Sequence, residues 1–205
     1  MSQIVASVNS SLCSKVGHKQ RGFTLIELIV TLVIMGIMSV IAVPRFFDFA
    51  TDAKVASLKG VEASLTTAVR NIQAKANIEG QTRVTAGGGS GTSFNFDGLT
   101  LTIYNQGVPR EIWANGFEQL MVGDFNFVGR GPTQLDTECT SSEFCVVDNL
   151  RINTIISGKS GYGIFFFPKG YTLNDMCFTY YAFALGAGGF LDYKEVETVT
   201  TGCYS

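Results

Sequence analysis

The longest apolar stretch of this chain lies near its beginning. Residues 23–43 read FTLIELIVTLVIMGIMSVIAV, with Glu27 as the single ionisable side chain. A helix of this length extends about 31 Å, enough to cross the hydrocarbon core of a bilayer. A carboxylate inside such a run costs free energy unless it meets a partner, so Glu27 is a candidate functional residue.

Beyond Arg45 the apolar positions recur every three or four residues, as in an amphipathic helix. We therefore predict one helix from Phe23 to about Glu79, apolar on all sides over 23–43 and on one side over 44–79. Gly36 and Pro44 are its weak points, because glycine costs about 1 kcal/mol inside a helix and proline removes a hydrogen bond. The apolar stripe consists of Val55, Leu58, Val61, Leu65, Ala68, Ile72 and Ala76.

Residues 80–205 are rich in glycine and in strand-forming residues, and they are numerous enough to form one core. Composition predicts a flexible loop over 80–92 and a short helix over 109–121. The predicted fold class is α+β, with an antiparallel sheet packed on the second half of the long helix. Strands are expected at 99–104, 125–128, 145–147, 162–167, 176–185 and 196–201.

Charge is distributed unevenly along the chain. Residues 1–22 hold three of the 15 Lys and Arg residues and none of the 17 Asp and Glu residues. Residues 23–205 therefore carry 12 basic and 17 acidic side chains, a formal net charge of −5. A basic stretch before a long apolar run is expected to stay cytoplasmic, which places the rest of the chain outside. We do not expect this acidic remainder to bind nucleic acid.

Residues 23–205 contain no histidine, because the single histidine, His18, precedes the apolar run. Neither a Ser-His-Asp triad nor a histidine-ligated metal site is then available. Gly158-Lys159-Ser160 ends like a phosphate-binding loop, but Asn153 stands where that motif requires its first glycine. We expect no enzyme activity, no cofactor and no metal.

Two other groups of side chains have structural interpretations. Glu195 and Glu197 lie two residues apart, on one face if they form a strand, and are expected on a solvated edge that discourages stray strand pairing. Trp113 and the aromatic residues at 165–167, 180 and 181 are expected in the core rather than in a sugar-binding platform, because aromatics dominate cores.

Four of the five cysteines lie in the C-terminal third of the chain, and Cys13 lies in the basic leader. An even number of exported cysteines predicts two disulfides. Of the three possible connectivities we favour Cys139–Cys145 with Cys177–Cys203, because sequential pairing suits a small meandering sheet. Buried free thiols are the alternative.

The residues around Gly22 resemble the processing site of type IV pilins and of the related secretion pseudopilins. The matching segment is Arg21-Gly22-Phe23-Thr24-Leu25-Ile26-Glu27-Leu28, which follows a basic leader. The continuation Val43-Pro44-Arg45-Phe46-Phe47 is more narrowly similar to pilins of the mannose-sensitive haemagglutinin (MSHA) type. Further similarity to that type lies in Asp52-Ala53-Lys54, in the segment 167–171 and in the late cysteines 177 and 203.

The resemblance implies that residues 1–22 are a leader, that a prepilin peptidase cuts between Gly22 and Phe23, and that the new amino terminus of Phe23 is methylated. It also implies partial melting of the helix between Gly36 and Pro44 in a fibre. The new amine needs an opposite charge in an apolar core, so we predict that Glu27 pairs with the Phe23 amine of a neighbouring subunit. The alternative is that Glu27 only extends to the lipid headgroups.

The resemblance further implies the ladle-shaped pilin fold and a structural subunit that polymerises into an MSHA-like type IV pilus for surface adhesion. The precursor would cross the inner membrane once, with its head in the periplasm, before it reaches the cell-surface pilus. Expected partners are identical or related pilin subunits, the prepilin peptidase, the inner-membrane assembly platform with its ATPase, and host or surface glycans. A minor pilin that primes the fibre and a type II secretion pseudopilin are the alternatives.

Overall fold

The computed structural model describes residues 22–81 and 91–204, and the side chains of residues 41–48 and 188 lie outside that description. The predicted leader therefore falls outside the described residues except for Gly22, and so does most of the predicted loop over 80–92. The contacts within the chain divide it into two compact units, Met1–Arg45 and Phe46–Ser205.

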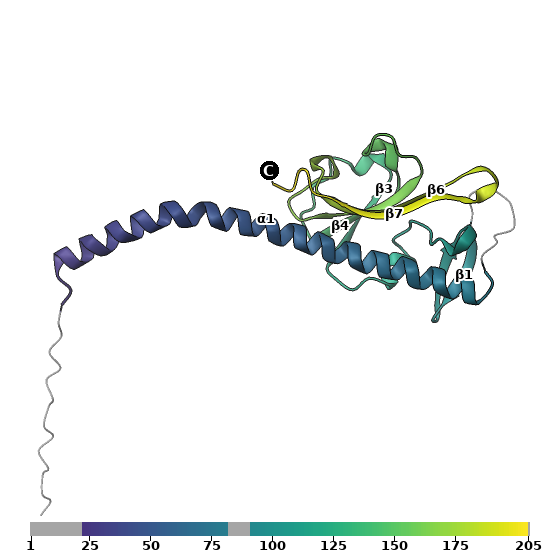
Figure 1. Ribbon diagram of the computed structural model, residues 1–205, viewed down its shortest axis with the longest axis horizontal. Coiled ribbons are helices and arrows are strands. Elements are labelled where there is room, and N and C mark those ends of the chain that lie inside the picture. Colours follow the sequence, from purple (N-terminus) through teal and green to yellow (C-terminus); the bar gives the residue numbers. More distant parts are fainter. Residues whose placement is uncertain (1–21, 82–90, 205) are drawn as a thin grey trace, which may run out of the picture. The chain divides into compact units, whose positions relative to one another are not determined.

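One helix, α1, runs from Leu25 to Ile78 (Figure 1). The predicted start, Phe23, is therefore two residues too early, and the predicted end, Glu79, is one residue too late. The backbone stays helical at Gly36 and at Pro44, the two predicted weak points. Among the described residues, no helix is apolar over enough of its length to cross a membrane. The last three side chains of the predicted span, at 41–43, are outside the description.

The second unit contains a five-stranded sheet in the order β3-β4-β5-β6-β7. Its strands are β3 (Phe125–Arg130), β4 (Phe144–Arg151), β5 (Tyr162–Pro168), β6 (Phe178–Leu185) and β7 (Leu191–Val199). Neighbours from β4 to β7 pair antiparallel, as predicted, but β3 pairs parallel to β4. The connection 131–143 is long enough to carry the chain back to the same end of the sheet, which a parallel pair requires.

A separate hairpin joins β1 (Thr92–Phe96) to β2 (Leu99–Ile103). The sequence reading missed β1, although Asp97-Gly98 is a strong signal for a two-residue hairpin turn. Both turn residues have positive φ, 49° and 89°, as that turn demands. The helix predicted over 109–121 is wrong, because only Phe117–Gln119 forms a 3-10 turn. Asn115, at φ 57°, interrupts the helical backbone just before Gly116.

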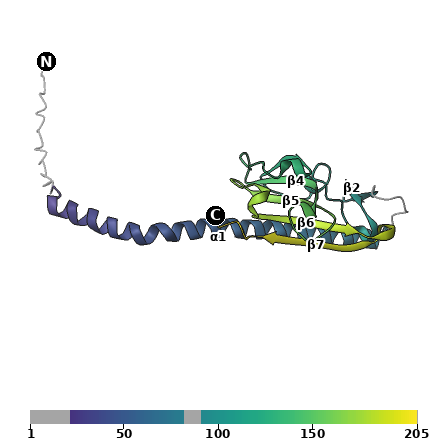
Figure 2. The ribbon, with the colours of Figure 1, turned by 90° about the horizontal axis from the view of Figure 1, so that it is seen from above.

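The C-terminal part of α1 packs on one face of the sheet, as predicted (Figure 2). Alternate residues of the central strands point to the helix because strand side chains alternate between faces. Leu58, Leu65 and Ile72 have no exposed surface, which confirms the predicted stripe, and Val69 extends it. The strand residues that meet the helix are Val146, Ile164, Phe166, Tyr181 and Phe183.

The opposite face of the sheet forms a second core with the loops that cover it. Phe165, Phe178 and Tyr180 are fully buried there, and the ring of Phe165 stacks on that of Tyr180 at 5.4 Å between centroids. A third, smaller core joins the end of α1 to the β1–β2 hairpin through Ile72, Phe94 and other apolar residues. The helix thus supports both the sheet and the hairpin.

Candidate functional site

The segment predicted to be processed lies directly before α1. Gly22, Phe23 and Thr24 have no regular secondary structure and are exposed. The backbone N–H of Glu27 donates to the hydroxyl oxygen of Thr24 at 3.3 Å, which places Thr24 at the helix N-cap. The sequence reading missed this cap, although Thr-x-x-Glu before an apolar run is its usual signature. An accessible peptide bond next to a side-chain-free glycine is open to a protease.

Glu27 lies in the first turn of α1, where a negative charge interacts favourably with the helix dipole. Its neighbours on the helix are almost all apolar and uncovered. The exposed fraction of the large apolar side chains in this part of α1 ranges from 48% at Ile34 to 77% at Val40. Such a surface, contiguous over several turns, marks a place where a partner or a lipid phase packs.

Gly36 lies in the middle of this apolar part of the helix. A Cβ atom placed there would meet nothing within 4 Å, so packing inside the chain does not explain the glycine. The hydroxyl of Ser39 donates to the backbone oxygen of Met35 at 2.7 Å. Such side-chain bonds to the preceding turn compete with backbone bonding and favour bending of a helix. Melting between Gly36 and Pro44 remains a prediction.

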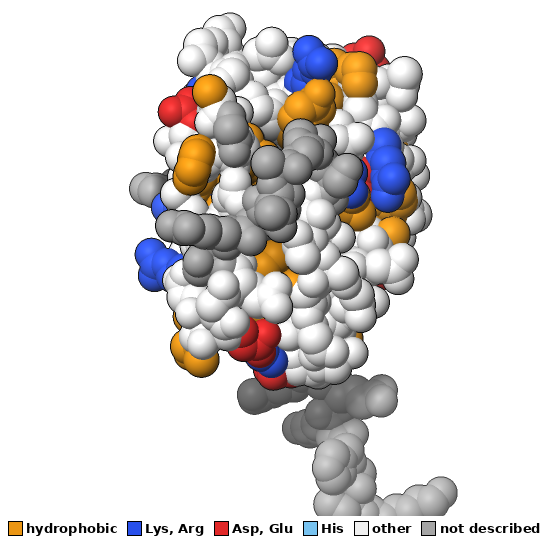
Figure 3. Space-filling view, turned by 90° about the vertical axis from the view of Figure 1, so that its right-hand side faces the viewer, with side chains coloured by type: hydrophobic (Ala, Val, Ile, Leu, Met, Phe, Trp, Pro, Cys, Tyr) orange, Lys and Arg blue, Asp and Glu red, His pale blue; other side chains and the backbone are white. Residues whose placement is uncertain are grey.

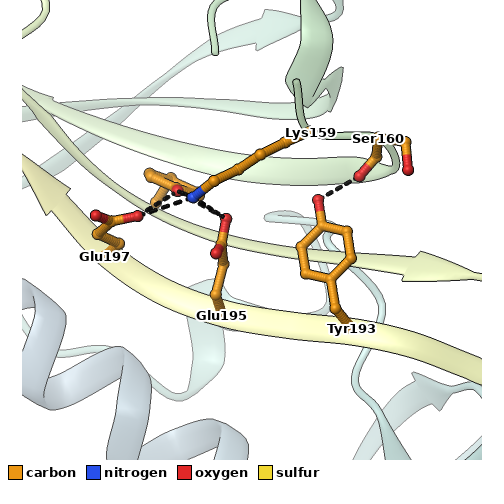
Figure 4. A network of polar contacts seen from close by, with 6 residues as sticks. Lys159, Ser160, Tyr193, Glu195 and Glu197 are labelled. Carbon is orange, nitrogen blue, oxygen red and sulfur yellow. Dashed lines mark hydrogen bonds and ion pairs between the residues drawn. The ribbon is translucent and has the colours of Figure 1, made fainter. Parts of the chain in front are cut away.

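In the head, Lys159 binds two carboxylates on β7 (Figure 4). Its Nζ lies 2.7 Å from Oε1 of Glu195 and 2.9 Å from Oε2 of Glu197, and it also donates to the Tyr180 hydroxyl at 2.7 Å. We call these four residues the lysine clamp. The two glutamates lie on an edge strand, as expected, but they also bind Lys159, which explains this lysine without a phosphate ligand.

The electrostatics of the lysine clamp follow from its geometry. Burial lowers the pKa of Lys159, but the hydrogen bonds to Glu195 and Glu197 outweigh it and raise that pKa overall. The hydrogen bond from Lys159 holds the pKa of Glu197 below its ordinary value. Burial and the same two carboxylates raise the pKa of Tyr180, which therefore stays protonated. The clamp ties the loop after β4 to the last strand.

A second charged pair joins the fully buried carboxylate of Asp148 to the half-exposed Arg130. Oδ2 of Asp148 accepts the backbone N–H of Trp113 at 2.8 Å, and Oδ1 lies 3.1 Å from Nε of Arg130. Burial raises the pKa of Asp148, although the Trp113 and Arg130 contacts oppose the shift. This carboxylate holds the 109–121 segment against β4, which is a structural role.

The remaining predicted residues also have structural places. Trp113 and the aromatic residues at 165–167, 180 and 181 are buried, which confirms a core role over a sugar platform. The disulfides are Cys139–Cys145 and Cys177–Cys203, the connectivity that the sequence favoured. Within 22–81 and 91–204, no cluster of His, Cys, Asp and Glu is arranged to hold a metal ion.

The end of the head near the hairpins carries separate small groups of basic, acidic and apolar side chains, as Figure 3 shows for that face. One of the acidic positions at this end of the molecule is Asp97, whose Oδ1 lies 2.6 Å from Nζ of Lys75 on α1.

Comparison with known proteins points to the N-terminal region. Residues 17–43 match the family described as the prokaryotic N-terminal methylation motif. The chain is 42% identical over 59 residues to the type IV narrow pilus major component PilA5 of Thermus thermophilus, a stretch covering 28% of this chain and 51% of that protein. It is 39% identical over 61 residues to the fimbrial protein EcpB of Eikenella corrodens, covering 30% of this chain and 38% of that protein.

The chain thus spans about half or less of the length of these curated relatives. No solved structure matches the chain significantly. The matched stretch contains the exposed Gly22-Phe23 junction, the Thr24 cap, Glu27 and the uncovered apolar helix. The N-terminal segment of this chain is therefore similar to the N-terminal methylation motif family and to parts of these two pilus proteins.

Proposed function

We propose that this chain is a pilin, a structural subunit that is processed at its N-terminus and polymerises into a type IV pilus at the cell surface. The observation that carries the proposal is the apolar helix beginning at Leu25, whose large side chains are about half or more exposed although they are suited to a core. At about 25 cal/mol per Å² of apolar surface, covering this helix with copies of itself would supply a large driving force for assembly.

We further propose that cleavage between Gly22 and Phe23 frees the Phe23 amine, which becomes methylated and pairs with Glu27 of a neighbouring subunit. Support comes from the position of Glu27 in the first turn of an exposed apolar helix. There, a new ammonium group in a packed core needs a negative partner. The pair would also set the stagger between neighbouring helices, because it forms at one register only.

The precursor would reside in the inner membrane through residues 23–43 before assembly, with the head in the periplasm. This part of the proposal rests on the sequence, in which a basic leader precedes the apolar run. Two disulfides in the head suit an oxidising compartment outside the cytoplasm. The prepilin peptidase and an assembly platform with its ATPase would be the machinery that handles the precursor.

A major rather than a minor subunit is favoured by one relative, whose name describes a major pilus component. Attachment to surfaces or host glycans as an MSHA-type pilin rests on the narrower sequence similarity beyond residue 43. Subunit stoichiometry in purified fibres tests the first point, because a major pilin makes up most of the fibre mass.

Mass spectrometry of protein sheared from the cell surface tests the central proposal. We expect a chain that begins at methylated Phe23 and retains both disulfides. A chain found only in the membrane fraction, with residues 1–22 still attached, would contradict both processing and assembly. Abundant extracellular fibres also separate a pilin from a secretion pseudopilin, which would form none.

A further inference from the structure

A cleft of about 620 Å³ opens at one edge of the head, where the ends of β4 and β6 meet the start of β5. Ligand-binding pockets occupy about 300–1,000 Å³, so the cleft has the size of a small-molecule site. Its position is separate from the exposed apolar helix and from the lysine clamp, because neither contributes a side chain to its lining.

Irregular strand geometry shapes this cleft. The pairing of β4 with β5 shifts register between Val147 and Leu150, and Asn149 within that break has a φ of 51°. Directly before β5, Gly161 has a φ of 106° and approaches the backbone of Phe183 so closely that a Cβ atom would lie 2.1 Å from the Phe183 oxygen. Sheet irregularities of this kind frequently re-aim side chains next to functional sites.

A buried acid lies in the lining. Glu111 is only 3% exposed, and its Oε2 has no hydrogen-bond partner among the described residues. Burying an unpaired polar atom costs roughly 1–3 kcal/mol, so an orphan of this kind calls for an explanation. Burial also raises the pKa of Glu111. The unpartnered carboxyl oxygen can accept a hydrogen bond from a ligand hydroxyl group.

Two arginines line the same cleft as the acid. Arg110 and Arg151 both line the cleft, and neither forms an ion pair with a carboxylate in the part of the chain that the structure describes. Nε of Arg151 donates to the Tyr162 hydroxyl at 3.1 Å, and its guanidinium carbon lies 5.5 Å from the centroid of that ring. Tyr162 thus fixes Arg151 in position, which reduces the entropy lost when a ligand binds.

We propose that this cleft binds a carboxylate-bearing sugar. The guanidinium groups of Arg151 and Arg110 suit the carboxylate, because arginine presents paired donors to planar anions. Glu111 and Asn149 suit the ring hydroxyls, and Tyr162 offers apolar surface to the ring. Inorganic phosphate fits less well, because it offers Glu111 and Asn149 no ring hydroxyls and offers Tyr162 no ring to pack against.

This inference extends the proposed role in attachment and rests on that role for its biological setting. The two fail separately, because assembly is judged from sheared fibres and ligand binding from the purified chain. The cleft belongs to the Phe46–Ser205 unit, so binding is measured on the full chain in detergent without requiring a fibre.

Isothermal titration of the full chain with D-glucuronate, D-glucose and inorganic phosphate tests the proposal. We expect saturable binding of glucuronate, with glucose at least about tenfold weaker, because glucose lacks the group that a charge-assisted bond would hold. Phosphate at the same concentration should not displace glucuronate. Equal affinities for glucuronate and glucose, displacement by phosphate, or no saturable binding would each overturn the assignment.

Variants place the ligand in the cleft. Arg151→Gln should weaken glucuronate binding about tenfold, whereas Arg70→Gln on the exposed face of α1 should leave it unchanged. Asn153→Asp adds a negative charge at the exposed rim and should weaken glucuronate binding but spare glucose. The fluorescence of Trp113 verifies the fold of each variant. Unaltered glucuronate affinity in both folded cleft variants would refute the site.

Discussion

The hydroxyl oxygen of Thr24 accepts a hydrogen bond from the backbone N–H of Glu27 at 3.3 Å, so the acid occupies the third position of α1. A glutamate there already has a local reason to exist, because it interacts favourably with the helix N-terminus. This local role can be separated by experiment from the assembly role that we propose for the same carboxylate.

Glu27→Gln separates these roles. Glutamine is also accepted at this position of a capping box, so α1 should keep its start, but the charge proposed to pair with the Phe23 amine is lost. We expect normal removal of residues 1–22 and a loss of surface fibres, measured by shearing and immunoblotting. Thr24→Ala is the matched control, because it removes the cap, worth about 1 kcal/mol, and keeps the charge. Wild-type fibre yield from Glu27→Gln would refute the assembly role.

Leu65→Ala tests the packing of α1 on the sheet. Leu65 has no exposed surface and belongs to the core shared with Trp113 and Phe166. Deleting a buried leucine side chain typically lowers the free energy of unfolding by about 2–5 kcal/mol. Denaturant titration followed by Trp113 fluorescence measures the change. Lys59→Ala, on the exposed side of the same helix, should alter it by less than about 0.5 kcal/mol.

Lys159→Met tests the lysine clamp. The folded-state pKa of Glu197 is lowered, so its stabilising contribution is present above the pKa of the unfolded state and is lost as pH falls through the folded-state pKa. The folded-state pKa of Lys159 is raised, so its stabilising contribution is lost only when pH rises through that folded-state pKa. The contribution is therefore greatest between these limits. Because Glu197 is more than half exposed, we expect a loss of no more than about 1 kcal/mol near neutral pH.

In Lys159→Met, the free energy of unfolding should also fall less steeply as the pH is lowered below neutral. Lys169→Met, which removes an exposed lysine outside the clamp, is the matched control and should reproduce the wild-type curve. Urea titrations between pH 3 and pH 8 give the comparison. If both variants lose the same stability at every pH, the clamp has no specific electrostatic role.

Glu111→Gln tests the buried acid. Burial raises its pKa, so its contribution to stability is complete below the unfolded pKa, ordinarily about 4.3, and is lost as pH rises through the folded pKa. At neutral pH the glutamine variant should therefore be more stable than the wild type, and the difference should shrink toward pH 4. Thermal melting over this range measures it. A variant that is less stable at all pH values would show that the carboxyl group has a partner in the folded chain.

The two disulfides should differ in their contribution to stability. In the chain-entropy treatment, the Cys177–Cys203 bond, with a separation of 26, contributes about 3.5 kcal/mol, and the Cys139–Cys145 bond, with a separation of 6, about 2.2 kcal/mol. Replacing each pair with alanines and measuring denaturant unfolding under non-reducing conditions gives the comparison. An equal loss for both pairs would show that native packing, rather than loop length, sets their effect.

Much of α1 and of the segment directly before it was predictable from the sequence, because both depend on the order of residues along a short stretch of chain. The three-to-four-residue spacing of Leu58, Leu65 and Ile72 fixes which side of the helix is buried wherever the helix packs. The unbroken apolar run around Glu27 likewise belongs to one short stretch of chain. Most strands were also visible as alternating or β-rich runs, although β1 and the parallel pairing of β3 were not.

The lysine clamp and the cleft depended on the tertiary structure. Lys159 meets Glu195 across 36 positions of the chain, and only the pairing of β7 with β6 brings that glutamate beside Tyr180. Glu111 lines the same cleft as Asn149 and Arg151 because β4 passes beside the 109–121 segment. Contacts between distant parts of the chain are set by the packing of whole elements. The sequence determined which residues begin and line the helix, and the fold decided which charges meet.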